Sequence, residues 1–559
     1  MLLYNMISKY ISKYAALAVS AVATLGLTSC LDEVTPTSTV TDSMLETSST
    51  RDEALLMAMP SYLTAFNSGG REEHYDFGYP AIMRIRDVQT ADLTTTDGSQ
   101  DGYDHFKDFS RGYMTQSLAM EQFLWQFYNK AVQTCNIALK EFSADEDTPE
   151  RMGMRGQARA FRAMLYLDMA RIYEFLPNDA FANADLIGLT VPIVTENTTE
   201  EEGRNNPRAT HAEMLKFILD DLDYAEEHIE DSPVMERTLP TLAAVYGLKA
   251  RAYMWDENYP KAAEYAAMAV DESGCYPLSA SEWNDATSGF NSLANPSWIW
   301  GFQYVKEDDA ISTGIVNWIS FQSPENQFGY AGVMMLGPSC VAPVVNKAMY
   351  DRVSDTDFRK YTWIPDDMDS PLWNEVQLAN EESAPYFAYY APLAGVKFRC
   401  AMRELADPNV SCVVAVPLMR VEEMMLIEAE AEAHTNAAAG KALLEQFMSY
   451  RDPNYECTVS STEDVVEEIV FQKRVELWGE GQAFFDIKRL NYPIVRNYAG
   501  SNWPANLLYN TPGRPAWMNW PILISESNNN AGVRGKNNPD VAGCYGGPET
   551  PVDADQSAE

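Results

Sequence analysis

The sequence has few histidines and no cysteine pattern, and both absences limit what the protein can be. Only five His are present in 559 residues, and no two of the eight Cys have the CxxC spacing. A zinc site is therefore not expected. The last seven cysteines are Cys135, Cys275, Cys340, Cys400, Cys412, Cys457 and Cys544. This odd, widely spread set predicts buried free thiols, although Cys400 and Cys412 are near enough in sequence to form one bridge.

The sequence also contains none of the short motifs that mark the common catalytic classes. There is no Gly-rich phosphate loop, no Walker motif, no GxSxG and no HExxH. Carboxylate pairs remain, but 81 acidic residues bring such pairs together by chance. We therefore expect a binding protein and no enzyme, with a surface glycosidase as the alternative.

Positive charge is scarce. The chain has 41 Lys and Arg against 81 Asp and Glu, which gives a formal net charge of −40. This excess argues against nucleic acid or an anionic membrane face as a partner. It leaves carboxylates available for structural Ca²⁺, while no other cofactor is indicated. After residue 27, no apolar run approaches the roughly 20 residues that a membrane-spanning helix needs.

The N-terminus has the composition of a targeting segment. Lys9 and Lys13 form a positive region, residues 15–27 are apolar, and the sequence LTSC that ends at Cys30 resembles a lipobox. We therefore predict a lipoprotein signal peptide over residues 1–29. Cys30 becomes the acylated (palmitate-bearing) first residue of the mature chain and its lipid anchor.

Segments without periodicity flank the remaining chain. The sequence LDE at 31–33 resembles the surface-export signal of Bacteroidetes lipoproteins, and the rest of 30–50 is rich in Thr and Ser, which predicts a flexible tether. Residues 544–559 are expected to form an acidic, disordered tail. The binding domain is expected to occupy residues 51–543.

Apolar residues recur at helical spacing over most of this domain, which predicts a mainly α-helical fold. Thr148-Pro149 and the pair Thr210 and Glu213 are helix start signals. Small and aromatic residues have the spacing of one tetratricopeptide (TPR) repeat over 239–271, and such a repeat needs neighbours to bury its face. TPR-like helix pairs are expected over roughly 117–272 and 420–490. Individual helices are predicted over 51–66, 122–142, 149–176, 239–255, 260–271 and 447–451.

A long, irregular insertion, 273–416, separates the two helical parts. It is poor in helical periodicity and rich in Pro, Gly and aromatics, and it is too long to be one loop. Its apolar runs at 298–305 and 412–417 predict short strands. In the first run, Trp298 and Trp300 alternate as on one face of a strand, which predicts core positions.

The stretch 464–491 places charges among apolar and aromatic residues. Ser460 and Glu463 have capping-box spacing for a first helix, and 483–490 predicts a second. Because an unpaired buried charge costs several kcal/mol or more, these charges are expected to form structural ion pairs. Asp486 is expected to pair with an arginine of this stretch. The charged residues are Arg474, Glu476, Glu480, Asp486 and Arg489.

This stretch resembles the C-terminal signature of the SusD/RagB family, in which Arg-x-Glu-Leu and Glu-Gly precede an Asp-aliphatic-Lys/Arg-Arg segment. Gln482 and Lys473 depart from the Arg and Glu usual there. Five further blocks resemble the family in order and spacing: residues 158–177, 188–194, 208–229, 416–434 and 447–451.

The resemblance implies a SusD-like fold and a specific role. Members are outer-membrane lipoproteins that face the cell exterior, bind oligosaccharide or polysaccharide, and deliver it to a partner SusC-like TonB-dependent transporter. The only membrane contact would be the lipid anchor. The TPR-like helices would pack on the transporter, while the insertion and the loops after the first helix would supply ligand residues.

Aromatic faces stack on sugar rings, and polar side chains bind the hydroxyl groups. Trp283 and Trp318 lie next to polar residues in irregular parts of the insertion, so we expect them to be exposed and to contact ligand. Further candidates are Asn326, Tyr330, Tyr103 and His105. The sequence does not name the glycan, and a peptide cargo or a TPR-type protein-binding scaffold or adhesin stays open.

Overall fold

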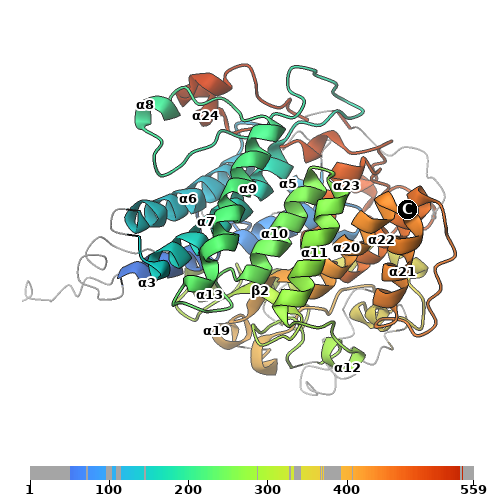
Figure 1. Ribbon diagram of the computed structural model, residues 1–559. Coiled ribbons are helices and arrows are strands. Elements are labelled where there is room, and N and C mark those ends of the chain that lie inside the picture. The colour runs from blue at the N-terminus through green and yellow to red at the C-terminus, as the bar shows by residue number, and fades with distance from the viewer. Residues whose placement is uncertain are drawn as a thin grey trace, which may run out of the picture.

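A computed structural model describes residues 51–70, 73–95, 103–108, 115–143, 147–285, 287–326, 329–332, 341–365, 367, 369, 392–405, 407–541 and 544–545. This part of the chain is mostly helical with a few short strands, which confirms the predicted fold class (Figure 1). The predicted signal peptide, Cys30 and the tether lie outside the described residues. Within the described ranges, no helix is both long and apolar enough to cross a membrane.

The first helical layer contains α3 (Arg51–Tyr62), α6 (Ala119–Phe142), α7 (Pro149–Tyr173) and α9 (His211–His228). Thr148 starts α7 by accepting a hydrogen bond from the backbone N–H of Arg151. Thr210 and Glu213 form a complete capping box at α9, as their spacing predicted.

Two helices end earlier than predicted. α3 ends at Tyr62, although its pattern continued to residue 66. α7 ends at Tyr173 because Glu174 leaves helical geometry, with φ −54° and ψ 128°. The carbonyls at this end accept hydrogen bonds from the ammonium of Lys488, at 2.8 Å from Arg171 and 2.9 Å from Ile172. This side chain therefore caps the C-terminus of α7 from a distant part of the chain.

The second layer joins two distant parts of the chain. α10 (Leu242–Trp255) packs on α11 (Tyr259–Ser273), and α11 packs on α20 (Val421–Thr435). Figure 1 shows these green and orange helices side by side. Gly440 lets α21 (Ala437–Met448) approach α20 closely, because a Cβ there would lie 2.4 Å from the Cβ of Ala433. α22 (Thr462–Glu476) and α23 (Ala483–Leu490) complete this layer.

Several boundaries in this layer differ from the prediction: α10 begins at Leu242 and not at 239, and α11 is longer than expected at both ends. Of the helix expected over 447–451, only Phe447 and Met448 are helical, as the last residues of α21, and the rest of this helix lies before the predicted range. α22 is capped by Ser461 and not by Ser460: the Ser461 side chain accepts from the backbone N–H of Asp464 at 3.1 Å. The neighbouring serine offers equivalent chemistry one residue later, so sequence spacing alone did not separate the two.

The insertion reaches the core through short strands. β2 (Trp298–Gln303) pairs antiparallel with β4 (Ala415–Arg420), and β1 (Leu93–Thr95) pairs with β3 (Pro343–Val345). Trp298 and Trp300 are buried, as predicted. Figure 1 places the short helices α12 (Ala280–Trp283), α13 (Asp309–Ser312) and α19 (Pro408–Ser411) along the lower edge of the scaffold, with α13 next to α19 and α12 apart from them. Other short elements are α4 (Tyr79–Val88), α5 (Asp104–Lys107), α8 (Glu200–Gly203), α14 (Trp318–Gln322), α16 (Lys347–Arg352) and α24 (Ile524–Asn529), and the 3-10 turns at Ile229–Asp231, Phe358–Thr362, Ala401–Arg403, Ala505–Leu507, Ala516–Met518 and Ala531–Val533.

The C-terminal segment covers the end of α4. The indole N–H groups of Trp517 and Trp520 donate to the backbone and side-chain oxygens of Gln89, at 3.0 and 3.1 Å. Tyr545, the second residue of the predicted tail, is buried, and its hydroxyl donates to Asp179 at 2.8 Å. The tail therefore begins with an anchored residue, and residues 546–559 lie outside the described part.

Candidate functional site

The charged stretch 464–491 forms a buried network of ion pairs. The guanidinium of Arg474 pairs with Asp92 at 2.5 Å, while Glu480 pairs with Lys397 at 2.6 Å and with Arg420 at 2.9 Å. All of these side chains are nearly inaccessible to solvent. The network therefore joins this stretch to β1 and to the insertion.

Asp486 lies at one end of the same network. It pairs with Lys473 at 2.9 Å and with Arg489 at 3.2 Å. Arg474, the other arginine of the stretch, reaches Asp92 instead. The buried carboxylate of Glu430 also contacts both cations that hold Asp486.

Glu476 has the largest set of arginine partners in this network. Its carboxylate pairs with Arg451 at 2.9 Å and with Arg420 and Arg359 at 3.2 Å each. Burial opposes ionisation of Glu476, but the guanidinium groups of Arg451 and Arg420 hold its pKa below the ordinary value. The three arginines come from separate segments, so this carboxylate cross-links them.

Trp283 and Trp318 are buried, so the expectation that they are exposed is wrong. Their relative accessibilities are 2% and 0%. The indole N–H of Trp283 donates to Thr362 at 2.9 Å, and Trp318 packs edge-on against Phe398. The polar neighbours that suggested a surface are helix caps: the capping box of α12 precedes Trp283, and Asn317 caps α14. Neither ring offers a face to a ligand in this conformation.

Tyr103 and Tyr330 belong to one aromatic cluster, which joins the loops after the first helix to the insertion. Phe321 stacks on Tyr330, with ring centroids 4.6 Å apart, and meets Tyr103 edge-on at 5.3 Å. Both tyrosines are buried, and the Tyr330 hydroxyl contacts the exposed ring of His74. His105 belongs to α5, but its side chain lies outside the described part.

Asn326 is not at the surface either, and the described cysteines form no bridge. The Asn326 amide is buried and donates to the Cys412 sulfur at 3.4 Å. Cys400 and Cys412 are both free, so the bridge considered from the sequence is absent. Among the described residues, no group of three or more His, Cys, Asp or Glu side chains is arranged to hold a metal ion.

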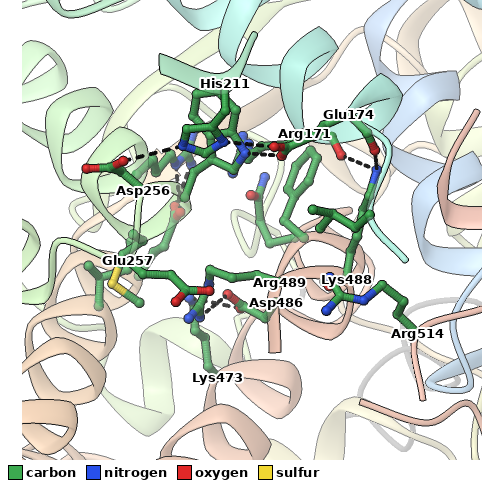
Figure 2. Close-up of a pocket in the computed structure, with 18 residues that line it drawn as sticks. Arg171, Glu174, His211, Asp256, Glu257, Lys473, Asp486, Lys488, Arg489 and Arg514 are labelled. Atoms are coloured by element: carbon green, nitrogen blue, oxygen red, sulfur yellow. Dashed lines mark hydrogen bonds and ion pairs between the residues drawn. The ribbon is translucent and has the colours of Figure 1, made fainter. Parts of the chain in front are cut away.

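A separate cavity of about 240 Å³ lies among the helix ends (Figure 2). Its wall is built from the C-terminal ends of α7 and α10, the start of α9, and parts of α20, α22 and α23. Figure 2 shows ionisable groups around its whole circumference. The lining is Arg171, Glu174, Leu176, His211, Arg251, Met254, Trp255, Asp256, Glu257, Glu423, Ile427, Lys473, Gln482, Phe485, Asp486, Lys488, Arg489 and Arg514.

Most carboxylates of this wall have a partner. Glu174 accepts from the His211 ring at 2.8 Å and from the Trp255 indole at 2.7 Å. Asp256 lies 3.4 Å from the other nitrogen of His211. Burial opposes protonation of His211, but its bonds to Glu174 and Asp256 raise its pKa above the ordinary value.

The cations of the wall are held in two different ways. Arg251 forms a bidentate pair with Glu423, and Arg171 pairs with Asp168, which underlies the wall. Lys488 donates only to backbone carbonyls, and burial lowers its pKa well below the ordinary range. Arg514 donates to the Asn491 side-chain oxygen at 3.1 Å and to the Lys488 carbonyl at 2.7 Å.

Sequence analysis did not find this cavity. Its residues come from six segments between Arg171 and Arg514, and no local motif connects them. The sequence features that fall on its wall are the charges Asp486 and Arg489 and the departures at Gln482 and Lys473. Neither departure points to a cavity without knowledge of which helix ends meet.

Two family models match the chain. The model SusD-like_3, described as "Starch-binding associating with outer membrane", matches residues 91–254, and the SusD_RagB model of the SusD family matches residues 414–540. The first match ends before the insertion, and the second begins near the end of it. Together the two matches span more than half of the chain. No curated protein matches the sequence significantly.

Solved structures share the fold. A SusD-like carbohydrate binding protein from Bacteroides vulgatus has a TM-score of 0.67 and 23% identity, over 87% of this chain and 98% of its own. A SusD superfamily protein from Bacteroides thetaiotaomicron has a TM-score of 0.61 and 17% identity, over 87% and 99%. A SusD-like carbohydrate binding protein from Bacteroides fragilis has a TM-score of 0.59 and 17% identity, over 87% and 99%.

Proposed function

Because the chain belongs to the SusD/RagB family, we propose that it is an outer-membrane lipoprotein that binds an oligosaccharide or polysaccharide at the cell surface. The observation that carries this proposal is the pair of family models at 91–254 and 414–540, which match in the expected order. The family is a carbohydrate-binding, non-catalytic one, in agreement with the prediction of a binding protein and no enzyme.

Delivery to a SusC-like TonB-dependent transporter is the second part of the proposal. The stacked helices α10, α11 and α20 would pack on the transporter, and acylated Cys30 would hold the protein at the membrane. Capture and release then involve no covalent chemistry, because the transporter only needs the bound glycan to be brought to its entrance. The net charge of −40 is consistent with a chain that meets the membrane only through its lipid anchor and its transporter, because it argues against direct contact with an anionic membrane face.

We place the glycan contact at the edge of the aromatic cluster that contains Tyr103 and Tyr330. This edge joins the two segments from which ligand residues were expected, and the His74 ring is exposed there against the Tyr330 hydroxyl. A neutral sugar offers no charge to bind, so ring faces and hydroxyl groups must supply the affinity. An exposed imidazole beside a phenol provides both kinds of contact.

Calorimetric titration of the purified full chain with starch, xylan and mannan oligosaccharides tests both parts of the binding proposal. We expect one of them to bind, His74→Ala to weaken binding by about tenfold, and Tyr330→Phe to weaken it by about two- to tenfold, the effect of one lost hydrogen bond. His228→Ala is the control, because His228 packs on Tyr224 in α9, away from this edge.

The possible failures are distinguishable. If no oligosaccharide binds the wild-type chain, the glycan-binding proposal is wrong for these ligand classes. If one binds and both variants bind it equally well, the function stands and the assigned location is wrong.

A further inference from the structure

We propose that the cavity in Figure 2 is a second binding site, which takes a small ligand bearing a carboxylate group. The site goes beyond the proposed glycan function and contains neither His74 nor Tyr330. Its volume of about 240 Å³ lies below the roughly 300–1,000 Å³ of cavities that hold drug-sized ligands. It therefore suits one sugar acid or one amino acid.

Arg514 carries the argument for a carboxylate. Within the described ranges, no Asp or Glu oxygen lies within 4 Å of its guanidinium, whereas Arg171, Arg251, Lys473 and Arg489 each have a carboxylate partner. Arg514 is only partly buried, and it lines the cavity. A planar guanidinium matches a carboxylate in geometry as well as in charge.

The guanidinium is also held in place before any ligand arrives. Its Nε and Nη1 atoms donate to the Asn491 side-chain oxygen and to the Lys488 carbonyl, at 3.1 and 2.7 Å. Asn491 ends α23 in the left-handed conformation, with φ +58°. Its side chain also accepts from the backbone N–H of Arg514. Two nitrogens are thus engaged, and binding would order little additional structure.

A second cation without a carboxylate lies beside it. All three hydrogen bonds of the Lys488 ammonium go to backbone carbonyls, at 2.8 to 2.9 Å. Burial lowers the pKa of Lys488 and of Arg514. The more distant carboxylate of Glu174 opposes this for both cations, and Arg514 lowers the pKa of Lys488 further. A bound carboxylate would give these two cations the close ionic partner that no described Asp or Glu side chain provides within 4 Å.

The aromatic rings of the wall do not offer a stacking platform for a neutral sugar. The Arg171 guanidinium lies 3.6 Å from the centroid of Phe485, and Arg86 lies over the same ring at 4.7 Å. The His211 ring lies on Trp255, with centroids 3.9 Å apart. Because charged or polar groups already lie against both rings, recognition at this site must come from ionic contacts and hydrogen bonds.

Glu257 distinguishes two kinds of carboxylate ligand, a sugar acid and an amino acid. Figure 2 shows it across the cavity from Arg514, and no described cation lies within 4 Å of it. A hexuronic acid would bring no positive charge to Glu257. An amino acid would bring its ammonium there while its carboxylate meets Arg514.

The test is calorimetric titration of the full chain in detergent with three probes: glucuronate, glutamate and neutral glucose. We expect at least one of the two carboxylate probes to bind and glucose to give no signal. Arg514→Gln is expected to weaken the binding about tenfold or more, because a hydrogen bond to a charged group contributes about 1.5–3 kcal/mol. Arg514→Lys keeps the charge and is expected to lose less affinity.

Arg534→Gln is the matched control. Arg534 is exposed, lies outside the cavity and donates to the backbone carbonyls of Ser527 and Asn528, so its loss should leave binding unchanged. Glu257→Gln should weaken glutamate binding if the ligand is an amino acid. It should leave glucuronate binding equal or tighter if the ligand is a sugar acid.

The proposal is overturned if neither carboxylate binds, if glucose binds equally well, or if a folded Arg514→Gln protein binds like the wild type. His74→Ala and Tyr330→Phe must bind the carboxylate probe normally. A loss in those variants would place the probe at the proposed glycan site and would also refute a separate site.

Discussion

Replacing Glu476 by Gln should destabilise the protein through its buried ion pairs without changing the shape of the residue. The carboxylate is inaccessible to solvent and pairs with Arg451, Arg420 and Arg359. Arg420 keeps Glu480 after the substitution, and Arg359 keeps Asp357 at 2.7 Å. Among the described carboxylates, Arg451 keeps only Glu422, at 3.1 Å, beside its bond to the Leu278 carbonyl, so most of the cost falls on it.

Removing one partner from a buried pair costs about 3–5 kcal/mol. Because the other pairs of Arg420 and Arg359 survive, we expect the lower part of this range. An unfolding entropy of about 2.1 cal/mol/K per residue is roughly 1 kcal/mol/K for a chain of this size, so Tm should fall by about 3 °C. Differential scanning calorimetry at pH 7 measures this change directly.

Asp220→Asn is the matched control. Asp220 pairs with Lys216 at 2.5 Å on the surface of α9, where both side chains are more than half exposed. Exposed pairs contribute little, so Tm should change by less than about 1 °C. If Glu476→Gln lowers Tm no more than Asp220→Asn does, the buried network does not stabilise the fold.

The pH dependence gives a second check. Because the folded-state pKa of Glu476 lies below its unfolded value of 4.5, its contribution is present above about pH 4.5 and is lost as the pH falls toward the folded-state value. The stability difference between wild type and Glu476→Gln should therefore be full at pH 7 and smaller below about pH 4. A difference that grows on acidification would contradict the assigned ionisation.

Three further outcomes are expected. Trp318→Ala and Trp283→Ala should each cost about 3–5 kcal/mol of stability in a denaturant titration, as core truncations do, and a normal unfolding midpoint would contradict their burial. His211→Gln should lower Tm at pH 6 but not at pH 9. The folded-state pKa of His211 is raised, so its stabilising contribution is present below the unfolded pKa of 6.5 and is lost as the pH rises through the folded-state pKa. Equal losses of Tm at both pH values would show that charge is not involved. Cys30→Ser should move the protein out of the membrane fraction, because acylation supplies the proposed anchor, whereas retention in high salt would refute it.

Local chemistry explains which parts of the fold were predictable. Thr148 and Thr210 identified the starts of α7 and α9 because capping depends on residues within one helical turn. The same local view failed for Trp283 and Trp318. Their polar neighbours are caps of short helices inside the insertion, and a cap on a short, packed helix has the same sequence as a surface loop.

The cavity was beyond the reach of sequence analysis for a different reason. Arg514 and Lys488 become adjacent because the loop before Arg514 folds back onto the end of α23, and Lys488 itself caps α7. Each contact joins segments that are separated in the chain, so no periodicity or motif contains it. The charges of 464–491 were identified as paired, but most of their partners, such as Asp92 and Lys397, lie outside that stretch.

The buried network also bears on how the protein could bind and release a ligand. Lys397 and Arg359 belong to the insertion. Arg359 is held by Glu476, the last residue of α22, and Lys397 by Glu480, just beyond that helix. A buried ion pair adds little net stability compared with apolar packing, but separating its members exposes an uncompensated charge and costs several kcal/mol. This part of the insertion is therefore fixed to the helices in one arrangement. Any closure over a bound glycan must occur in other parts of the insertion or in the loops after the first helix, which is where we place the glycan contact.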